Sequence, residues 1–164
     1  MSNRKIAVYG IIMASYTVLS LLVGAFSFGL MQIRIAELLM VLVLEDGEYI
    51  LPLSLGCFLA NMIGVLCGMN AMVIDILVGT IATYISGVLV YMFRHIRLCN
   101  KPILSLLMPP IVNGLLVGLE LHFVLDIGFM MAFGYVFAGE FVAVTILGSI
   151  LGDGLCRVIE NFKK

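Results

Sequence analysis

The side chains in this chain that could do chemistry are a few polar residues placed inside long apolar stretches. They are Arg34, Glu37, Asn61, Asp75, Asn113, Glu120, His122 and Glu140. An ionisable group at the centre of a bilayer costs at least roughly 2.5–3.5 kcal/mol, so it usually faces the protein interior and has a function. Five different stretches contribute these residues, which predicts a shared polar pocket.

Some of these residues also have purely structural interpretations. Arg34 and Glu37 are three residues apart and can pair with each other on a helix. Asn61 and Asn113 can bridge neighbouring helices, and His122 is better explained as a snorkelling or capping residue than as a ligand. One arginine cannot neutralise four carboxylates, however. Either some are protonated, or a cationic or donor-rich ligand completes the set.

The composition identifies the class of protein. Of the 164 residues, 63% are hydrophobic and only 12% are charged, and the mean hydropathy is +1.21. A soluble domain carries about 25% charged residues. About 20 apolar residues cross a bilayer as a helix, and the alternating pattern of barrel strands is missing. We therefore expect an all-α integral membrane protein, a compact bundle of six transmembrane helices.

The expected spans form a single membrane domain over residues 1–164. They lie at about 6–25, 31–44, 49–66, 71–93, 102–124 and 131–155. Pro109 and Pro110 should kink the fifth span near its middle, and the sixth should leave the membrane near 152–154. The glycine- and phenylalanine-containing stretch 24–29 is a candidate gate at the pocket mouth. Asp126 and Asp153 are expected to be solvated.

The basic residues predict the orientation. Eight of the nine lysines and arginines fall at the N-terminus, in the loop between the fourth and fifth spans, or at the C-terminus. Six spans place these three regions on one side, which the positive-inside rule makes cytoplasmic. Both termini of this plasma-membrane protein are then cytoplasmic. At about 1.5 Å per residue, most of the polar residues lie in the outer half of the bilayer.

Other classes of function have little support. The four cysteines are scattered without a C-x-x-C pair, no paired ligand set suggests a metal or another cofactor, and no basic run suggests nucleic acid. Motifs of hydrolases, metalloproteases and nucleotide-binding loops are missing, so we expect a protein that is not an enzyme. Gly10 and Ala14 form a small-xxx-small pair that would let another helix approach closely.

In order along the chain, these features resemble the QueT family of substrate-binding S components of energy-coupling factor (ECF) transporters. The matching stretches are 32–37, 56–61, 75–80, 109–113, 118–120 and 139–140. The resemblance implies a six-helix fold that binds a precursor of the modified tRNA base queuosine from outside. It also implies an ECF module as partner, made of one transmembrane coupling protein and two ATPases. The resemblance further implies that the first helix docks on the coupling protein through an A-x-x-x-A surface. The matching positions here are Gly10 and Ala14.

The pocket suits the ligand that this resemblance implies. A 7-deazaguanine offers adjacent ring N–H and amino donors to one carboxylate, and an aminomethyl group would want a second. Asn61, Asn113 or Arg34 would donate to its carbonyl oxygen. Of the four carboxylates, Glu140 and Asp75 are the first choices for binding. Aromatic stacking candidates are Phe26, Phe28, Phe123, Phe133, Tyr135 and Phe137.

Several points stay open at this stage. The ligand could be the aminomethyl base preQ1, the nitrile preQ0 or queuine, or thiamine or another small cationic or nucleobase-like micronutrient. An autonomous proton-coupled carrier would use the same carboxylates as a proton relay. A helical scaffold would use the polar residues only to lock helices together.

Overall fold

The computed structural model describes residues 3–29, 32–70, 72–98 and 101–163, apart from the side chains of residues 25, 26 and 160–163. The elements are helical throughout this described part of the chain. In order they are α1 (Asn3–Leu22), α2 (Gly24–Ser27), the 3₁₀ helices η1 (Ile35–Leu44) and η2 (Gly47–Tyr49), α3 (Ile50–Leu66), α4 (Asp75–Phe93), α5 (Ile103–Leu106), α6 (Met108–Leu125), α7 (Phe129–Glu140), the π-helix η3 (Phe141–Ile146) and α8 (Leu147–Lys163).

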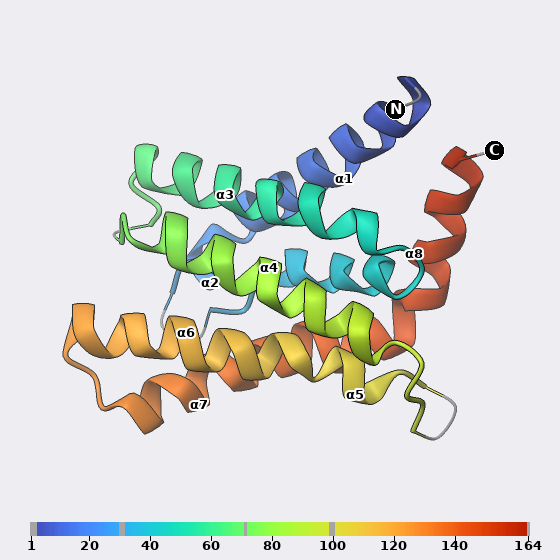
Figure 1. Ribbon diagram of the computed structural model, residues 1–164. Helices are drawn as coiled ribbons and strands as arrows, with labels where there is room; N and C mark the ends of the chain where they lie inside the picture. Colours follow the sequence, from blue (N-terminus) through green and yellow to red (C-terminus); the bar gives the residue numbers. More distant parts are fainter. Residues whose placement is uncertain (1–2, 30–31, 71, 99–100, 164) are drawn as a thin grey trace.

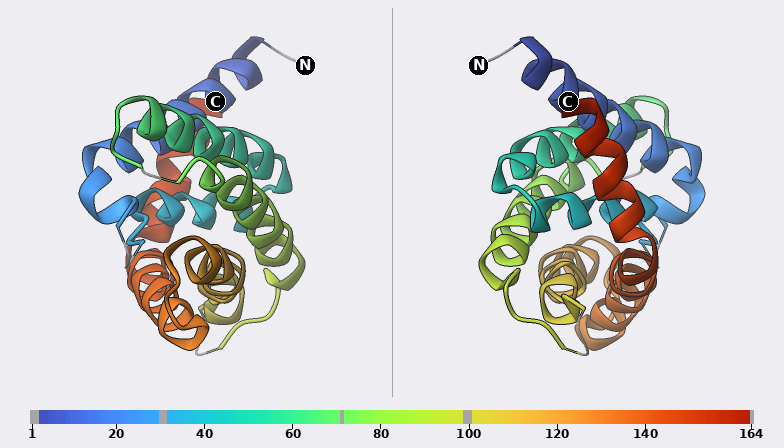
Figure 2. Two further views of the ribbon diagram at one scale, coloured as in Figure 1. Left: turned by 90° about the vertical axis from the view of Figure 1, so that its left-hand side faces the viewer. Right: turned by 90° about the vertical axis from the view of Figure 1, so that its right-hand side faces the viewer.

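The helices pack as a membrane bundle, which confirms the predicted fold class. Five helical segments of the described chain are long and apolar enough to cross a bilayer, and η1 is a shorter apolar helix. In the side view of the bundle (Figure 1) and in the views from its two ends (Figure 2), α1 packs on α3, α3 on α4, α4 on α6 and α6 on α7. The chain is therefore a multi-pass membrane protein.

The short helix η1 lies in the middle of this arrangement. It contacts α1, α4, η3 and α8, and its residues from Met40 to Val43 are buried on every side. A helix that is apolar all round is suited to such burial. The expected second span thus appears as a ten-residue central helix that begins at Ile35. Residue 31, the expected start of that span, lies outside the described residues.

The two prolines act at a different place from the predicted kink. Pro109 and Pro110 lie in the first turn of α6, and the short helix α5 ends before them at Leu106. A proline in the first turn removes an N–H that has no partner within the helix anyway. The fifth span, Ile103–Leu125, is thus interrupted at Leu107, just before the prolines, and this break lies nearer the start of the span than the predicted mid-span kink.

The last segment changes its helical type directly after a carboxylate. α7 ends at Glu140, six residues of π-helix follow, and α8 then continues through Gly152–Gly154 without interruption. Single π-helical turns occur frequently at functional sites. Figure 1 shows α8 turning away from the bundle, toward the end where α1 begins and α4 ends. That shared end matches the geometry expected from the basic residues.

The helices α1 and α3 approach each other closely at a glycine. A Cβ atom added at Gly56 would lie 2.8 Å from Tyr16 Cβ and 2.9 Å from the Met13 backbone oxygen. We predict that Gly56→Ala lowers the free energy of unfolding by about 1–3 kcal/mol, because the two helices must separate to admit the methyl group. Thermal unfolding in detergent measures the effect.

The matched control is Gly10→Ala on α1, where an added Cβ would meet nothing within 4 Å. This variant should be as stable as the parent or slightly more stable, because alanine favours a helix over glycine. Equal stability of the two variants would contradict the tight α1–α3 contact.

Candidate substrate-binding site

The site is organised by a buried ion pair between Arg34 and Asp75. Arg34 lies just before η1 and Asp75 is the first residue of α4. The Nη2 atom of Arg34 donates to both carboxylate oxygens of Asp75, at 2.7 Å and 2.9 Å. Its Nε atom donates to Gln32 Oε1 at 3.0 Å. Charge-assisted bonds of this kind are the strong ones inside a protein.

Two asparagines hold the acidic end of the pair. Asn70 donates its Nδ2 to Asp75 Oδ2 at 2.9 Å, and its Oδ1 accepts from the Met72 backbone N–H at 2.9 Å. Asn61 on α3 donates its Nδ2 to the Asp75 backbone oxygen at 3.0 Å. The expected helix-bridging role of Asn61 is therefore confirmed. The start of α4 is fixed from two directions.

Glu37 has partners other than the predicted one. Its Oε1 accepts from the Tyr16 hydroxyl at 2.6 Å and from Thr83 Oγ1 at 2.7 Å. The expected pairing of Arg34 with Glu37 is wrong, because the backbone at Arg34 is not yet helical and its guanidinium reaches Asp75 instead. Glu37 Oε2 has no hydrogen-bond partner among the described residues.

Further buried polar groups near this network also lack partners. Within the described part of the chain, neither oxygen of Glu120 or Glu140 accepts a hydrogen bond, and both amide atoms of Asn113 and the Gln32 Nε2 are also unpaired. Glu140 is close enough to interact electrostatically with Glu37 and Arg34, as is Glu120 with Asp75 and Arg34. Buried polar groups are nearly always satisfied, so a cluster of unsatisfied ones points to a missing binding partner.

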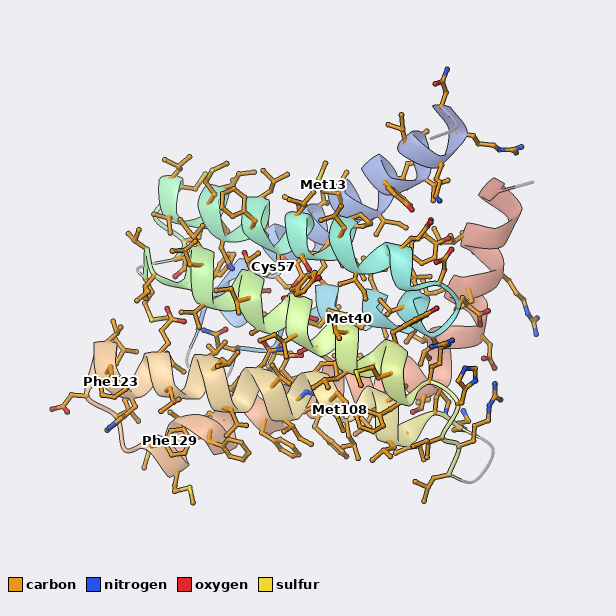
Figure 3. All side chains as sticks on the ribbon, in the orientation of Figure 1. Met13, Met40, Cys57, Met108, Phe123 and Phe129 are labelled. Atoms are coloured by element: carbon orange, nitrogen blue, oxygen red, sulfur yellow. The ribbon has the colours of Figure 1, made fainter. Side chains whose placement is uncertain are left out.

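The seven candidate residues converge from five helices and the segment before η1. All seven are buried, and they come from η1 (Glu37), α3 (Asn61), α4 (Asp75), α6 (Asn113, Glu120) and α7 (Glu140), with Arg34 just before η1. Figure 3 places Cys57, whose sulfur is 3.6 Å from Arg34 Nη1, in the middle of the bundle. No group of three metal-ligating side chains occurs among the described residues.

The sequence did not predict four hydrogen-bond partners of the charged site residues: Tyr16, Gln32, Asn70 and Thr83. Tyr16 and Thr83 sit in apolar stretches as ordinary helix residues, so nothing marked them. Gln32 and Asn70 had a weak signal, since both border glycine-containing turns. His122 has a local role, with its Nδ1 2.7 Å from the Ile127 backbone oxygen after the end of α6, which agrees with the expected capping.

The aromatic candidates separate into different places. Phe28 packs on α3, since a Cβ at Gly64 would lie 2.9 Å from its ring, and it lines a narrow void with Tyr16, Arg34 and Asn61. Phe133 and Phe137 stack on one another at 5.7 Å along α7. Phe123 is 79% exposed at the end of α6 (Figure 3), Tyr135 is exposed, and the Phe26 side chain lies outside the described residues.

A buried, carboxylate-rich site inside a multi-pass helical bundle defines a membrane protein that takes a small ligand. A family profile described as QueT transporter matches residues 6–157. The chain belongs to the QueT transporter family, and it is therefore a transport protein. The queuosine precursor transporter QueT of Lactococcus lactis subsp. cremoris (strain MG1363) is 26% identical over 166 residues, covering 94% of each chain. No solved structure matches the chain.

The ion pair yields a stability prediction. Arg34→Gln leaves the Asp75 carboxylate buried without its counter-charge, so it should lower the free energy of unfolding by about 3–5 kcal/mol. Lys5→Gln is the control, because Lys5 pairs with Glu48 at a partly exposed position, where a pair contributes about 0–1 kcal/mol.

Denaturant unfolding in detergent measures both variants. The double variant Arg34→Gln/Asp75→Asn should lose less stability than the two single variants added together. Each single variant leaves one buried charge without its partner, whereas the double variant removes both charges. Additive losses would show that the two side chains do not depend on each other.

Proposed function

We propose that this chain is the substrate-binding S component of an ATP-driven importer and that it captures a 7-deazaguanine queuosine precursor from outside the cell. The observation that carries the proposal is the set of buried, unsatisfied carboxylates around a single, already paired arginine. Such a site is rich in hydrogen-bond acceptors and poor in donors. The name of the Lactococcus relative adds support for this class of ligand.

The acceptor-rich site matches the chemistry of an aminated heterocycle. A deazaguanine presents its ring N–H and exocyclic amino group side by side, which suits one carboxylate with two free oxygens. The aminomethyl group of preQ1 carries a positive charge and suits a second carboxylate. The nitrile preQ0 lacks that charge, so a second free carboxylate favours preQ1, or the aminated side chain of queuine, over preQ0.

The hydrogen bonds suggest a division of roles among the seven residues. Asp75, Arg34 and Asn61 already satisfy one another and support the site. In contrast, Glu140, Glu120 and Asn113 have free polar atoms and would contact the ligand, together with Glu37 Oε2. Of the two first choices, Glu140 thus stays a ligand-binding candidate, while we assign Asp75 to support.

The carboxylate that matters most can be tested by an isosteric change. Glu140→Gln removes the charge and one acceptor but keeps the shape of the side chain. Hydrogen bonds to charged groups contribute about 1.5–3 kcal/mol, so the dissociation constant for preQ1 should rise about 10- to 150-fold. Isothermal titration calorimetry on the purified chain measures it.

Asp126→Asn is the matched control for this change. Asp126 is exposed and has a left-handed backbone (φ 54°) at the end of α6, a conformation that asparagine tolerates. The affinity of the Asp126→Asn variant for preQ1 should equal that of the parent protein. An unchanged affinity in Glu140→Gln, with the variant folded, would remove Glu140 from the site.

Transport in this proposal depends on an ECF module of one transmembrane coupling protein and two ATPases. On α1, Ala14 is exposed and Gly10 has open space beside it, since an added Cβ meets nothing within 4 Å. Two small residues four positions apart on a free helix face allow another helix to approach closely. This face is the proposed docking surface, with both termini of the chain on the cytoplasmic side.

The docking surface gives a prediction separate from ligand binding. Gly10→Leu places a bulky side chain on the free face of α1, so it should abolish co-purification with the coupling protein and ATPases. Affinity for preQ1 should not change. Gly134→Leu on α7 is the control, because Gly134 is exposed and likewise has nothing within 4 Å of its Cβ position. This variant should assemble normally. Loss of assembly in both variants would refute a specific role for α1.

A proton-coupled carrier is the alternative favoured by one observation, the same unpaired carboxylates in the membrane. The two mechanisms differ in their energy source. Uptake of labelled preQ1 that survives inactivation of the partner ATPases, and that follows a pH gradient, would favour the carrier.

A further inference from the structure

A second cavity lies at the end of the bundle that holds the termini, away from the carboxylate site. It has a volume of about 370 Å³ and forms where the end of η1, the loop after α4 and the first half of α8 meet. Its charged lining residues are Arg94, Arg97, Lys101, Glu45 and Asp153. The proposed substrate site uses none of them.

Two of the three cations in this cavity, Arg94 and Lys101, are held in place by hydrogen bonds to backbone oxygens. Arg94 lies 3.7 Å from the centre of the Tyr91 ring and donates Nη1 to the Tyr91 backbone oxygen at 2.7 Å. Lys101 donates to the Ser149 backbone oxygen. Among the described residues, neither these cations nor Arg97 has a carboxylate within 4.0 Å. Glu45 and Asp153 also line the cavity and are exposed, but neither forms an ion pair with these cations.

We propose that this cavity binds the phosphate of an anionic phospholipid. Three unpaired cations around one hollow are a complement to a phosphate group. Basic pockets between transmembrane helices near the membrane surface are suited to anionic head groups. Glu45 and Asp153 at the same cavity would accept hydrogen bonds from head-group hydroxyls, as in phosphatidylglycerol.

Exposed apolar side chains around the cavity favour a lipid over a soluble phosphate. Ile96 and Leu98 alternate with the basic residues of the loop, and Ile150 and Leu151 lie between lining residues of α8. All four are at least 45% exposed. The cavity wall itself includes Val41, Leu44 and Pro102. A soluble anion would leave this surface uncovered, whereas acyl chains would cover it.

The test is native mass spectrometry of the purified full-length chain with phosphatidylglycerol or phosphatidylcholine. The parent should retain phosphatidylglycerol preferentially. Arg97→Gln should retain about fivefold less of it, because a basic residue near the surface contributes about 1 kcal/mol to anionic lipid binding. Arg157→Gln on α8 is the matched control, exposed but outside the cavity, and it should behave as the parent.

Each other outcome would overturn the proposal. Equal losses in Arg97→Gln and Arg157→Gln would mean that general surface charge attracts the lipid. No loss in Arg97→Gln would exclude the cavity. Displacement of phosphatidylglycerol by equimolar glycerol phosphate would identify a soluble phosphate as the ligand instead. Normal lipid retention combined with failure of Arg97→Gln to assemble with partner subunits would assign the cavity to an acidic protein segment. Thermal unfolding of both variants verifies that they fold.

Discussion

The buried pair of Arg34 and Asp75 is the interaction on which the rest of the polar site depends. Neither charge can stay in an apolar bundle alone, so the segment before η1 and the start of α4 must remain together. The space for the pair comes from Gly79, where an added Cβ would lie 2.8 Å from Arg34 Nη1 and 3.0 Å from Asp75 Oδ1. The left-handed backbone of Gln32 (φ 43°) then brings its amide oxygen to the same guanidinium.

Because Arg34 pairs with Asp75, the other three carboxylates of the site have no positively charged partner among the described residues. The site has one arginine and four carboxylates, and the arginine makes its two shortest bonds to Asp75. Glu37 uses one oxygen for Tyr16 and Thr83, while Glu120 and Glu140 accept nothing within the described chain. The remaining polarity is therefore acidic. The ion pair and the hydrogen bonds around it hold the site together, and in the proposed function the unsatisfied oxygens would select the ligand.

The sequence was sufficient for the membrane class and for the positions of most helices, because an apolar stretch of membrane-spanning length leaves few alternatives. It also identified every charged residue of the site, since charge is costly in a bilayer. The sequence did not predict which carboxylate pairs with Arg34. Arg34 and Glu37 satisfy the helical i, i+3 rule, but Asp75, 41 residues away, wins because the backbone at Arg34 is not helical. Tyr16 and Thr83 carried no signal, because a hydroxyl in an apolar helix is unremarkable until its partner is known.

The helix α1 links the polar site to the proposed docking face. Tyr16 is buried and donates to Glu37, whereas Ala14, two residues earlier, is exposed. Residues two apart on a helix point to different faces, since each residue turns by about 100°. Thr17 donates to the Gly56 backbone oxygen at 3.1 Å and holds the same helix against α3. In the proposed function, a ligand bound by Glu37 would therefore contact a side chain that is already hydrogen-bonded to α1, the helix that carries the proposed docking face.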